Sequence, residues 1–257
     1  MCIPKLDQPD AATRLSIVLP TLNEAQNIEA MIRAATEILE RPQIGYELIV
    51  VDDDSPDGTW SRALKLSESL PRLRVMRRVN ERGLATAVLR GWQAAQGDVL
   101  GVLDADLQHP VETIPKLWTQ IESGADLAVA SRHVPGGGIS AWSWRRKLIS
   151  RAAQGIGLVV LPEVVGRLRD PMSGYLLVRR DKLAGVTMKP RGYKVLVEIL
   201  ARGRIESIAE VGYVFQERLE DRSKITWRSY RDYLLHLAML RLWRFSALGR
   251  GRSYFVA

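Results

Sequence analysis

Short apolar segments alternate with helix-like segments five times in the first half of the chain, and this pattern limits the fold more than any other feature. An apolar run of about 4–8 residues bounded by turn residues is typical of a buried strand. Each run precedes a longer stretch with apolar residues at helical spacing. We therefore expect an α/β fold, an open and mostly parallel sheet with helices on both faces. The expected strands are Leu15–Leu19, Tyr46–Val51, Leu73–Met76, Val99–Leu103 and Leu127–Ala130.

Two acidic residues follow the fourth apolar run. Side chains alternate along a strand, so Asp104 and Asp106 point the same way off the end of Val99–Leu103. In open α/β sheets, ligands bind outside the carboxyl ends of the strands. Two carboxylates there repel each other unless a cation lies between them, which favours a divalent metal. The alternative is an acidic turn that caps a helix expected from about Val111, and the pair alone does not separate the two interpretations.

Acidic residues also follow the first two expected strands. Glu24 lies just after the first strand, and Asp52 and Asp53 follow the second. A nicotinamide-binding Rossmann domain would have a glycine-rich turn where this chain has Pro-Thr-Leu-Asn-Glu, so that class of protein is excluded. Together with the Asp-x-Asp pair, these acids indicate a site for the ribose and base of a nucleotide, with a metal for its diphosphate. Asn23 is expected to cap a helix that runs to about Glu40.

Composition bears on the compartment and on the partners. The chain has 257 residues, a single cysteine (Cys2), no apolar core for a signal peptide in residues 1–14, and no run of about 18 apolar residues. We therefore expect a protein of the cytoplasm or of the cytoplasmic face of a membrane. The net charge of +8 is uneven, because residues from Arg132 onward hold 24 Lys and Arg against 10 Asp and Glu, whereas the earlier residues hold 13 against 19. The basic half indicates contacts with phosphate groups, an anionic membrane surface or nucleic acid.

Five short motifs occur in order along the chain. They are Pro20-Thr-x-Asn-Glu24, Val50-Val-Asp-Asp53, Asp57-Gly58-Thr59, Arg82-Gly-Leu84 and Asp104-Ala-Asp-x-Gln108-His-Pro110. With these motifs the chain resembles the inverting glycosyltransferases of family 2, in particular the dolichyl-phosphate mannose synthases and their bacterial polyprenyl-phosphate relatives. The resemblance runs from Leu15 to Tyr233. It implies the glycosyltransferase A fold and the transfer of a hexose, above all mannose from GDP-mannose, to a polyprenyl (dolichyl or undecaprenyl) phosphate.

The resemblance also implies a set of site residues. The nucleotide sugar is expected at Pro20, Leu22, Glu24, Val51, Asp53, Asp104, Ala105, Asp106, Gln108, Arg218 and Lys224. The metal, Mg²⁺ or Mn²⁺, is expected at Asp104, Asp106 and Gln108. The lipid phosphate is expected at Arg132, Arg146, Ser150 and Arg218, and the expected catalytic residues are Asp106, Arg132 and Arg218. One departure is Asp221, where many relatives have glycine three residues after the last of these arginines, and a residue with a Cβ restricts such a loop.

The acceptor decides whether the reaction needs a protein base. A phosphate monoester has a second pKa near ~6, so it is largely a dianion at pH 7 and needs no base. A sugar hydroxyl would need one, and Asp170 or Glu198 would then take the proton. Two further alternatives stay open: another donor such as UDP-glucose, and a non-catalytic module that binds nucleic acid or an anionic membrane. The resemblance makes nucleic acid an unexpected partner and allows for a membrane-anchoring subunit.

The second half of the chain has segments typical of a membrane surface. We expect a tail over residues 1–14, a catalytic domain over 15–225 with an acceptor loop and interface helix at about 133–166, and a C-terminal amphipathic helix and tail over 226–257. The apolar run Ile156–Val165 is either core or an interface helix. A helix is expected from Tyr193, and a strand at Ile208–Phe215.

The last expected helix, Thr226–Phe245, has a mixed pattern. Its polar side is expected to hold Arg228, Ser229, Asp232 and His236, and its apolar side Trp227, Tyr230, Leu234, Leu237 and Phe245. Arginines at 231, 241 and 244 flank or interrupt the apolar side. This pattern fits a helix that lies in a membrane surface, with its arginines at lipid phosphates, and a helix packed on the catalytic domain is the alternative.

Overall fold

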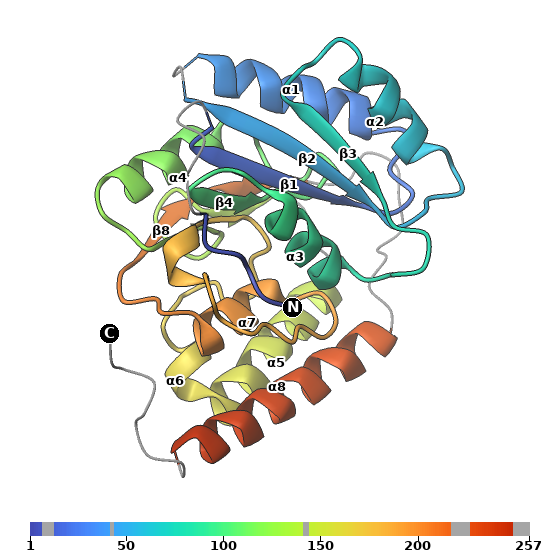
Figure 1. The fold of residues 1–257 in the computed structure, drawn as a ribbon. Coiled ribbons are helices and arrows are strands. Elements are labelled where there is room, and N and C mark those ends of the chain that lie inside the picture. The colour runs from blue at the N-terminus through green and yellow to red at the C-terminus, as the bar shows by residue number, and fades with distance from the viewer. Residues whose placement is uncertain (7–12, 42–43, 141–143, 217–226, 249–257) are drawn as a thin grey trace.

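A seven-stranded sheet is the centre of the structure (Figure 1). The computed structural model describes residues 1–6, 13–41, 44–140, 144–216 and 227–248, and only the backbone of residues 144–149, 227–229 and 247–248. The strand order is β3-β2-β1-β4-β7-β5-β8, and every neighbouring pair is parallel except the two pairs that include β7. The strands are β1 (Leu15–Thr21), β2 (Tyr46–Asp52), β3 (Leu73–Arg77), β4 (Val99–Val102), β5 (Leu127–Ser131), β7 (Leu176–Arg179) and β8 (Ile208–Gly212).

Helices cover both faces of the sheet, so the predicted α/β architecture is confirmed. Alternate strand residues belong to different cores: in β1, Ile17 and Leu19 pack in one core and Val18 in the other. The first core is formed with α1 (Ile28–Glu40), α2 (Thr59–Ser67) and α4 (Thr113–Glu122). The second is formed with α3 (Leu84–Ala94), α5 (Trp144–Val160), α6 (Pro162–Val165), α7 (Val195–Arg202) and α8 (Trp227–Leu248).

Strand β7 runs against both of its neighbours, which the alternating sequence pattern does not predict. It lies between β4 and β5 and is antiparallel to each. Its amino end therefore lies at the edge where the parallel strands have their carboxyl ends. The segment before β7, residues 170–175, is brought to that edge as a result. This placement brings Asp170 to the end of β5.

The predicted strand Ile208–Phe215 is wrong as a single element. The first part is β8, and after Gly212 the chain leaves the large sheet. The second part, β9 (Val214–Phe215), pairs with β6 (Gly138–Ile139) in a separate two-stranded sheet. The backbone of residues 135–137 passes very close to this break, because a Cβ at Gly212 would lie 2.3 Å from the carbonyl oxygen of Pro135.

Two predicted helix starts are also wrong. Asn23 does not cap a helix, because α1 begins only at Ile28, and Asn23 itself has a φ of +55°. Its backbone N–H donates to Ser55 Oγ at 2.9 Å, which ties the loop after β1 to the loop after β2. The helix expected from Tyr193 begins two residues later, at Val195.

One face of α8 packs against α5 and α7. Its buried side chains are Tyr233, His236, Leu237 and Leu240. The Tyr233 hydroxyl donates to the carbonyl of Ala153 in α5 at 3.2 Å, and His236 Nε2 lies 2.7 Å from Glu198 Oε2 in α7. The prediction that His236 and Leu237 lie on opposite sides of this helix is therefore wrong. Both belong to the packed face.

The opposite face of α8 is apolar and exposed. Its exposed large side chains include Leu234, Leu235, Met239, Leu242 and Phe245. From Leu235 onward they recur every three or four residues, and Leu234 lies beside Leu235, so they share one side of the helix. The helix α5, which lies beside α8 in Figure 1, adds three more: Ile156, Leu158 and Val159. Among the helices of the described residues, none is both long enough and apolar enough to cross a bilayer.

The arginines of α8 have partners within the protein. Arg241 and Arg244 lie 3.1 and 3.2 Å from Glu163 at the start of α6, and Arg231 lies 3.5 Å from Asp232. The predicted contact of these three arginines with lipid phosphates stays a prediction, because the pairs lie at the surface and Arg241 and Arg244 share one carboxylate.

Candidate active site

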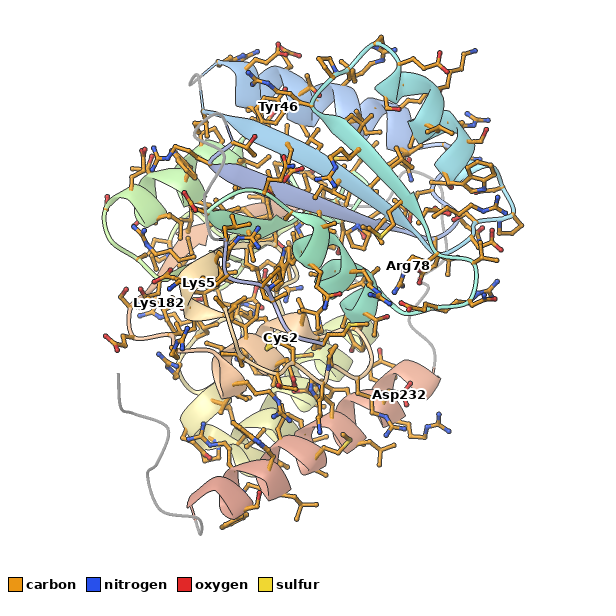
Figure 2. All side chains as sticks on the ribbon, viewed as in Figure 1. Cys2, Lys5, Tyr46, Arg78, Lys182 and Asp232 are labelled. Carbon is orange, nitrogen blue, oxygen red and sulfur yellow. The ribbon has the colours of Figure 1, made fainter. Side chains whose placement is uncertain are left out.

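The carboxyl ends of β1, β2, β4 and β5 form one edge of the sheet, with Arg78 at its far end after β3 (Figure 2). The backbone at this edge is unusual. Among the described residues, the non-glycine positions with positive φ are Asn23 (55°), Asp54 (56°) and Leu107 (60°), in the loops after β1, β2 and β4. Such conformations cost of order 1–3 kcal/mol each and cluster at functional sites. The edge is therefore the candidate site.

Asp52 and Asp53 hold the loops of this edge in place. Asp52 is fully buried and accepts a hydrogen bond from Thr21 Oγ1 at 2.7 Å. Asp53 forms a buried ion pair with Arg78, whose Nε donates to Oδ1 at 2.7 Å, and its Oδ2 accepts the backbone N–H of Gly83 at 2.6 Å. Asp53 thus fixes the segment that leads into α3. Its predicted contact with the nucleotide stays a prediction.

The other nucleotide-sugar residues predicted on β1, β2 and β4 lie at the same edge. Pro20 and Glu24 are buried, and Leu22 is 38% exposed. The side chains of Val51 and Ala105 are buried in the two cores. Any contact that these two residues make with a ligand must therefore come from their backbone.

Asp104 and Asp106 lie in the loop after β4. The Asp104 side chain is 30% exposed, and its Oδ2 lies 3.5 Å from His109 Nε2. Asp106 is partly exposed and accepts the backbone N–H of Gln108 at 3.2 Å. Mg²⁺ is usually bound by one or two carboxylates together with phosphate oxygens of the substrate. Two carboxylates fit a metal that is shared with a diphosphate. The described residues contain no group of three or more His, Cys, Asp and Glu that could hold a metal ion.

Gln108, the third predicted metal ligand, is buried and faces β9. Its Nε2 donates to the carbonyl of Gln216 at 3.0 Å, and the N–H of Gln216 donates to the carbonyl of Gln108 at 2.9 Å. These two bonds join the loop after β4 to the end of β9. Only the amide oxygen of Gln108 could bind a metal, and that role stays a prediction.

Arg132, at the end of β5, forms a buried ion pair with Asp170. Its Nε and Nη2 donate to the two carboxylate oxygens at 2.7 Å each, and its backbone N–H donates to Oδ2 at 3.0 Å. Burial alone would raise the pKa of Asp170, but the hydrogen bonds and charge of Arg132 outweigh burial and lower that pKa below its ordinary value. Asp170 is therefore ionised, and it already balances the charge of Arg132. A lipid phosphate at Arg132 would share the guanidinium with this carboxylate.

An aromatic cluster lies beside this pair. Around the His109 ring lie Tyr175, Tyr213 and Phe215, at centroid distances of 5.2, 5.4 and 5.2 Å. The Arg132 guanidinium lies 5.8 Å from the ring centroid of Phe215. Buried His109 faces Asp104 with Nε2, and its Nδ1 has no hydrogen-bond partner among the described residues. The cluster therefore connects Asp104 with Arg132 and holds the imidazole in one orientation, a role that the sequence did not indicate.

Glu198, the other candidate base, is fully buried in α7. His236 Nε2 lies 2.7 Å from its Oε2, and Arg202 Nε lies 2.8 Å from its Oε1. Burial raises the pKa of Glu198, but the bonds from His236 and from the backbone of Lys189, and the charge of Arg202, bring it below its ordinary value. These partners belong to α7, α8 and the segment before α7, and none is a predicted substrate-binding residue.

Several predicted residues lie outside the described part of the chain. They are Arg218 and Lys224, the departure at Asp221, and the side chain of Arg146. Ser150 is described and is half-buried in α5.

Two cations near this edge are not indicated by the sequence motifs. Arg78 follows β3 and pairs with Asp53, and Lys194 precedes α7 and donates to the carbonyl of Met172. Each stands directly beside a strand or helix end, which is the signal that identified the acids.

Comparison with known sequences gives several relatives. A family model described as glycosyl transferase family 2 matches residues 16–195. A dolichol-phosphate mannosyltransferase of Pyrococcus furiosus is 42% identical over 230 residues, which are 90% of this chain and 64% of that protein. A dolichol-phosphate mannosyltransferase of Saccharomyces cerevisiae is 33% identical over 90% of this chain and 88% of its own length. A polyprenol monophosphomannose synthase of Mycolicibacterium smegmatis is 33% identical over 88% and 86%. This chain thus spans less than two thirds of the Pyrococcus protein.

Comparison with solved structures gives the same fold. Glucosyl-3-phosphoglycerate synthase from Mycobacterium tuberculosis, solved with Mn²⁺, UDP-glucose and phosphoglyceric acid, superposes with a TM-score of 0.68 at 24% identity, over 90% of this chain and 80% of that one. Mannosyl-3-phosphoglycerate synthase from Rubrobacter xylanophilus superposes with a TM-score of 0.68 at 20% identity, over 94% and 77%. At these identities the likeness shows the fold alone.

Proposed function

The chain belongs to glycosyl transferase family 2, and on that premise we propose that it transfers mannose from GDP-mannose to a polyprenyl phosphate, with inversion at the anomeric carbon. The observation that carries this proposal is the match of about nine tenths of the chain to relatives named for dolichol-phosphate and polyprenol mannosyl transfer. The acceptor is a dolichyl or undecaprenyl type of phosphate. On one side of the carboxyl edge lie carboxylates that could hold a metal for the donor diphosphate. On the other side lies an arginine that could bind an anionic acceptor.

The state of the buried carboxylates supports a phosphate acceptor over a hydroxyl. A general base must accept a proton, yet Asp170 is bound at both oxygens by Arg132, and Glu198 is bound by His236 and Arg202. The pKa of each carboxylate is lowered, which makes each a weaker base. The dianion of a phosphate monoester attacks without a base, so the reaction does not need either residue.

The residues of the edge have separate tasks. Glu24 and the loops held by Asp53 face the nucleotide, and Arg132 orients the acceptor phosphate for in-line attack on the anomeric carbon. Asp104 and Asp106 would hold Mg²⁺ or Mn²⁺, which when bound supplies the positive charge that the leaving diphosphate requires. The transition state is oxocarbenium-like, so negative charge develops on the diphosphate beside these carboxylates.

The direct test uses a panel of nucleotide sugars. The protein is incubated with a divalent metal, a short polyprenyl phosphate and each donor in turn, and the glycolipid is identified by mass spectrometry. We expect a hexosyl polyprenyl phosphate from GDP-mannose. A product from UDP-glucose alone would contradict GDP-mannose as the donor, and the absence of a glycolipid with every donor would contradict polyprenyl phosphate as the acceptor.

The exposed apolar face of α8 is the proposed contact with the membrane. The substrate is a lipid, and this face lies beside exposed apolar side chains of α5. An amphipathic helix of this kind binds in the headgroup region and keeps its other face on the protein. We propose that the enzyme lies at the cytoplasmic face of a membrane. Exposed apolar side chains provide the contact, and Arg241 and Arg244 share the carboxylate of Glu163.

Replacing this face should separate membrane binding from catalysis. We expect the triple variant Leu235→Ser, Met239→Ser, Leu242→Ser to bind liposomes at least ~10-fold more weakly, because each buried apolar side chain contributes about 1.5–3 kcal/mol. Turnover of a short, soluble polyprenyl phosphate should stay near the wild-type value. The measurement is liposome co-sedimentation with parallel rate assays. Leu64→Ser, which changes a half-exposed leucine of α2, is the control. Unchanged liposome binding, or equal losses on soluble and membrane acceptors, would contradict this role of α8.

A further inference from the structure

Lys194 stands where a lysine is locally unfavourable. It is the residue before the first turn of α7, and its side chain makes no capping hydrogen bond. An oxygen-bearing side chain is preferred at this position, because it accepts a backbone N–H of the first turn. The amino end of a helix also carries partial positive charge, so the ammonium meets charge of its own sign. A residue that breaks such local rules is expected to have another task.

The contacts of Lys194 lead into the candidate active site. Its ammonium donates to the carbonyl of Met172, in the segment before the antiparallel strand β7. The same segment carries Asp170, which binds Arg132. It also carries Gly174, where an added Cβ would lie 3.6 Å from Asp104 Oδ2. One segment of six residues, 170–175, therefore connects Lys194 with the end of β5 and with the loop after β4.

Lys194 provides a positive charge that no carboxylate of the described residues balances directly. The charge of Arg132 is matched by Asp170. Lys194, in contrast, forms no ion pair with any carboxylate of the described residues, and its hydrogen bond to Met172 uses one of three ammonium N–H groups. Burial and the charge of Arg132 lower the pKa of Lys194 to about 8, against the opposing effect of Asp170 and Asp104. The ammonium is still largely protonated at pH 7. An anion beside it would offset both its burial and its repulsion by Arg132.

We propose that the Lys194 ammonium binds an oxygen of the acceptor's phosphate monoester, as a further phosphate-binding group beside Arg132. This inference rests on the proposed function. A lysine is a compact cation that binds phosphate as a point charge and complements the planar fork of arginine. The donor diphosphate is the other phosphate at the site. In the strand order, Glu24 and Asp53 follow β1 and β2 on one side of β4, whereas Arg132 and the segment bound by Lys194 belong to β5 and β7 on the other side. Lys194 is thus on the acceptor side.

The test compares the affinities for the two substrates. Lys194→Met and Lys194→Gln remove the charge, Lys194→Arg keeps it, and Lys189→Met is the control, an exposed lysine five residues earlier. Thermal unfolding first identifies the folded variants. Calorimetry then measures the Kd for a short-chain polyprenyl phosphate, and separately the Kd for GDP-mannose with Mn²⁺. Loss of a hydrogen bond to a charged group should weaken acceptor binding by about 10- to 100-fold in Lys194→Met and Lys194→Gln, and less in Lys194→Arg.

The outcomes separate this inference from the function on which it rests. Donor affinity should change by less than about twofold in all variants, and Lys189→Met should match the wild type. Unchanged acceptor affinity in a folded Lys194→Met or Lys194→Gln protein would overturn the inference while leaving the proposed function intact. Weaker binding of GDP-mannose with unchanged acceptor affinity would assign the ammonium to the donor diphosphate, and this result would also overturn the inference. A wild-type protein that binds GDP-mannose but neither binds nor mannosylates the lipid phosphate would overturn the proposed function, and this inference with it.

Discussion

Asp106→Ala is expected to lower kcat by about 10²–10³, because the developing charge on the leaving diphosphate loses a well-placed electrostatic stabiliser. Asp104→Ala and Gln108→Ala should have smaller effects. Asp104 lies beside His109, and the Gln108 amide is engaged by Gln216. The measurement is the initial rate with GDP-mannose, Mn²⁺ and a short polyprenyl phosphate. Calorimetry with Mn²⁺ and GDP in the absence of acceptor gives a second readout, in which we expect weaker metal-dependent binding of GDP by Asp106→Ala.

Asp98→Ala is the matched control for this experiment. Asp98 is an exposed carboxylate just before β4, whereas Asp106 lies in the loop after that strand. The two substitutions remove the same charge from opposite ends of β4, so an effect of net charge alone would be equal in both. We expect Asp98→Ala to turn over at the wild-type rate. An active Asp106→Ala protein, or turnover that EDTA does not reduce, would contradict the metal site.

Asp170→Asn is expected to lower the free energy of unfolding by about 3–5 kcal/mol, because Arg132 stays buried without its counter-charge. For a domain of this size, each kcal/mol lowers Tm by roughly 2–4 °C, so the total fall is on the order of 6–20 °C. The measurement is thermal unfolding followed by circular dichroism at pH 7. An effect below about 1 kcal/mol would show that the ion pair is not important for stability.

A double variant and the pH dependence test the cause of this loss. In Arg132→Met, Asp170→Leu no charge is left buried, so we expect it to be more stable than Asp170→Asn. The pKa of Asp170 is lowered in the folded protein. The pair therefore stabilises the fold above the ordinary Asp pKa near ~3.9, and that stabilisation is lost as the pH falls through the lower, folded-state pKa. The part of the acid-induced loss that comes from Asp170 should be absent in Asp170→Asn. An identical acid dependence in both proteins would contradict this cause.

Much of the fold follows from local patterns in the first half of the chain. Apolar strand segments and helical periodicity are properties of neighbouring residues, so the parallel sheet and its two helical layers could be predicted. Strand β7 could not, because it has four residues, and its direction depends on the neighbours between which it inserts. The predicted division of α8 into a polar and an apolar side was wrong because this helix also depends on its neighbours. Among its described side chains, those of residues 230–246, apolar residues lie on two opposite faces, one against α5 and α7 and one exposed, so these side chains do not form a single polar side.

The acidic residues of the site could be predicted from the sequence, whereas the contacts of its basic residues could not. Asp104 and Asp106 follow a strand directly, and strand ends in a parallel sheet share one edge, so local sequence gives their location. The partners of Arg132 and Lys194 come from residues 170–175, which only the antiparallel direction of β7 brings to this edge. No spacing in the sequence encodes such a contact. The same holds for the pairing of Arg78 with Asp53, which depends on the loop between β3 and α3.

One measurement tests most directly the claim that a phosphate oxygen is the nucleophile. The protein is given GDP-mannose, Mn²⁺ and one of two acceptors that differ only in the phosphate, a short polyprenyl phosphate and the corresponding polyprenol. Product mass and anomeric configuration are determined over a range of pH. We predict mannosyl polyprenyl phosphate with inverted configuration, no product from the alcohol, and a rate that rises with pH through the acceptor's second pKa near ~6. Mannosylation of the alcohol at a comparable rate, or an acid limb that disappears in Asp170→Asn or Glu198→Gln, would contradict the account.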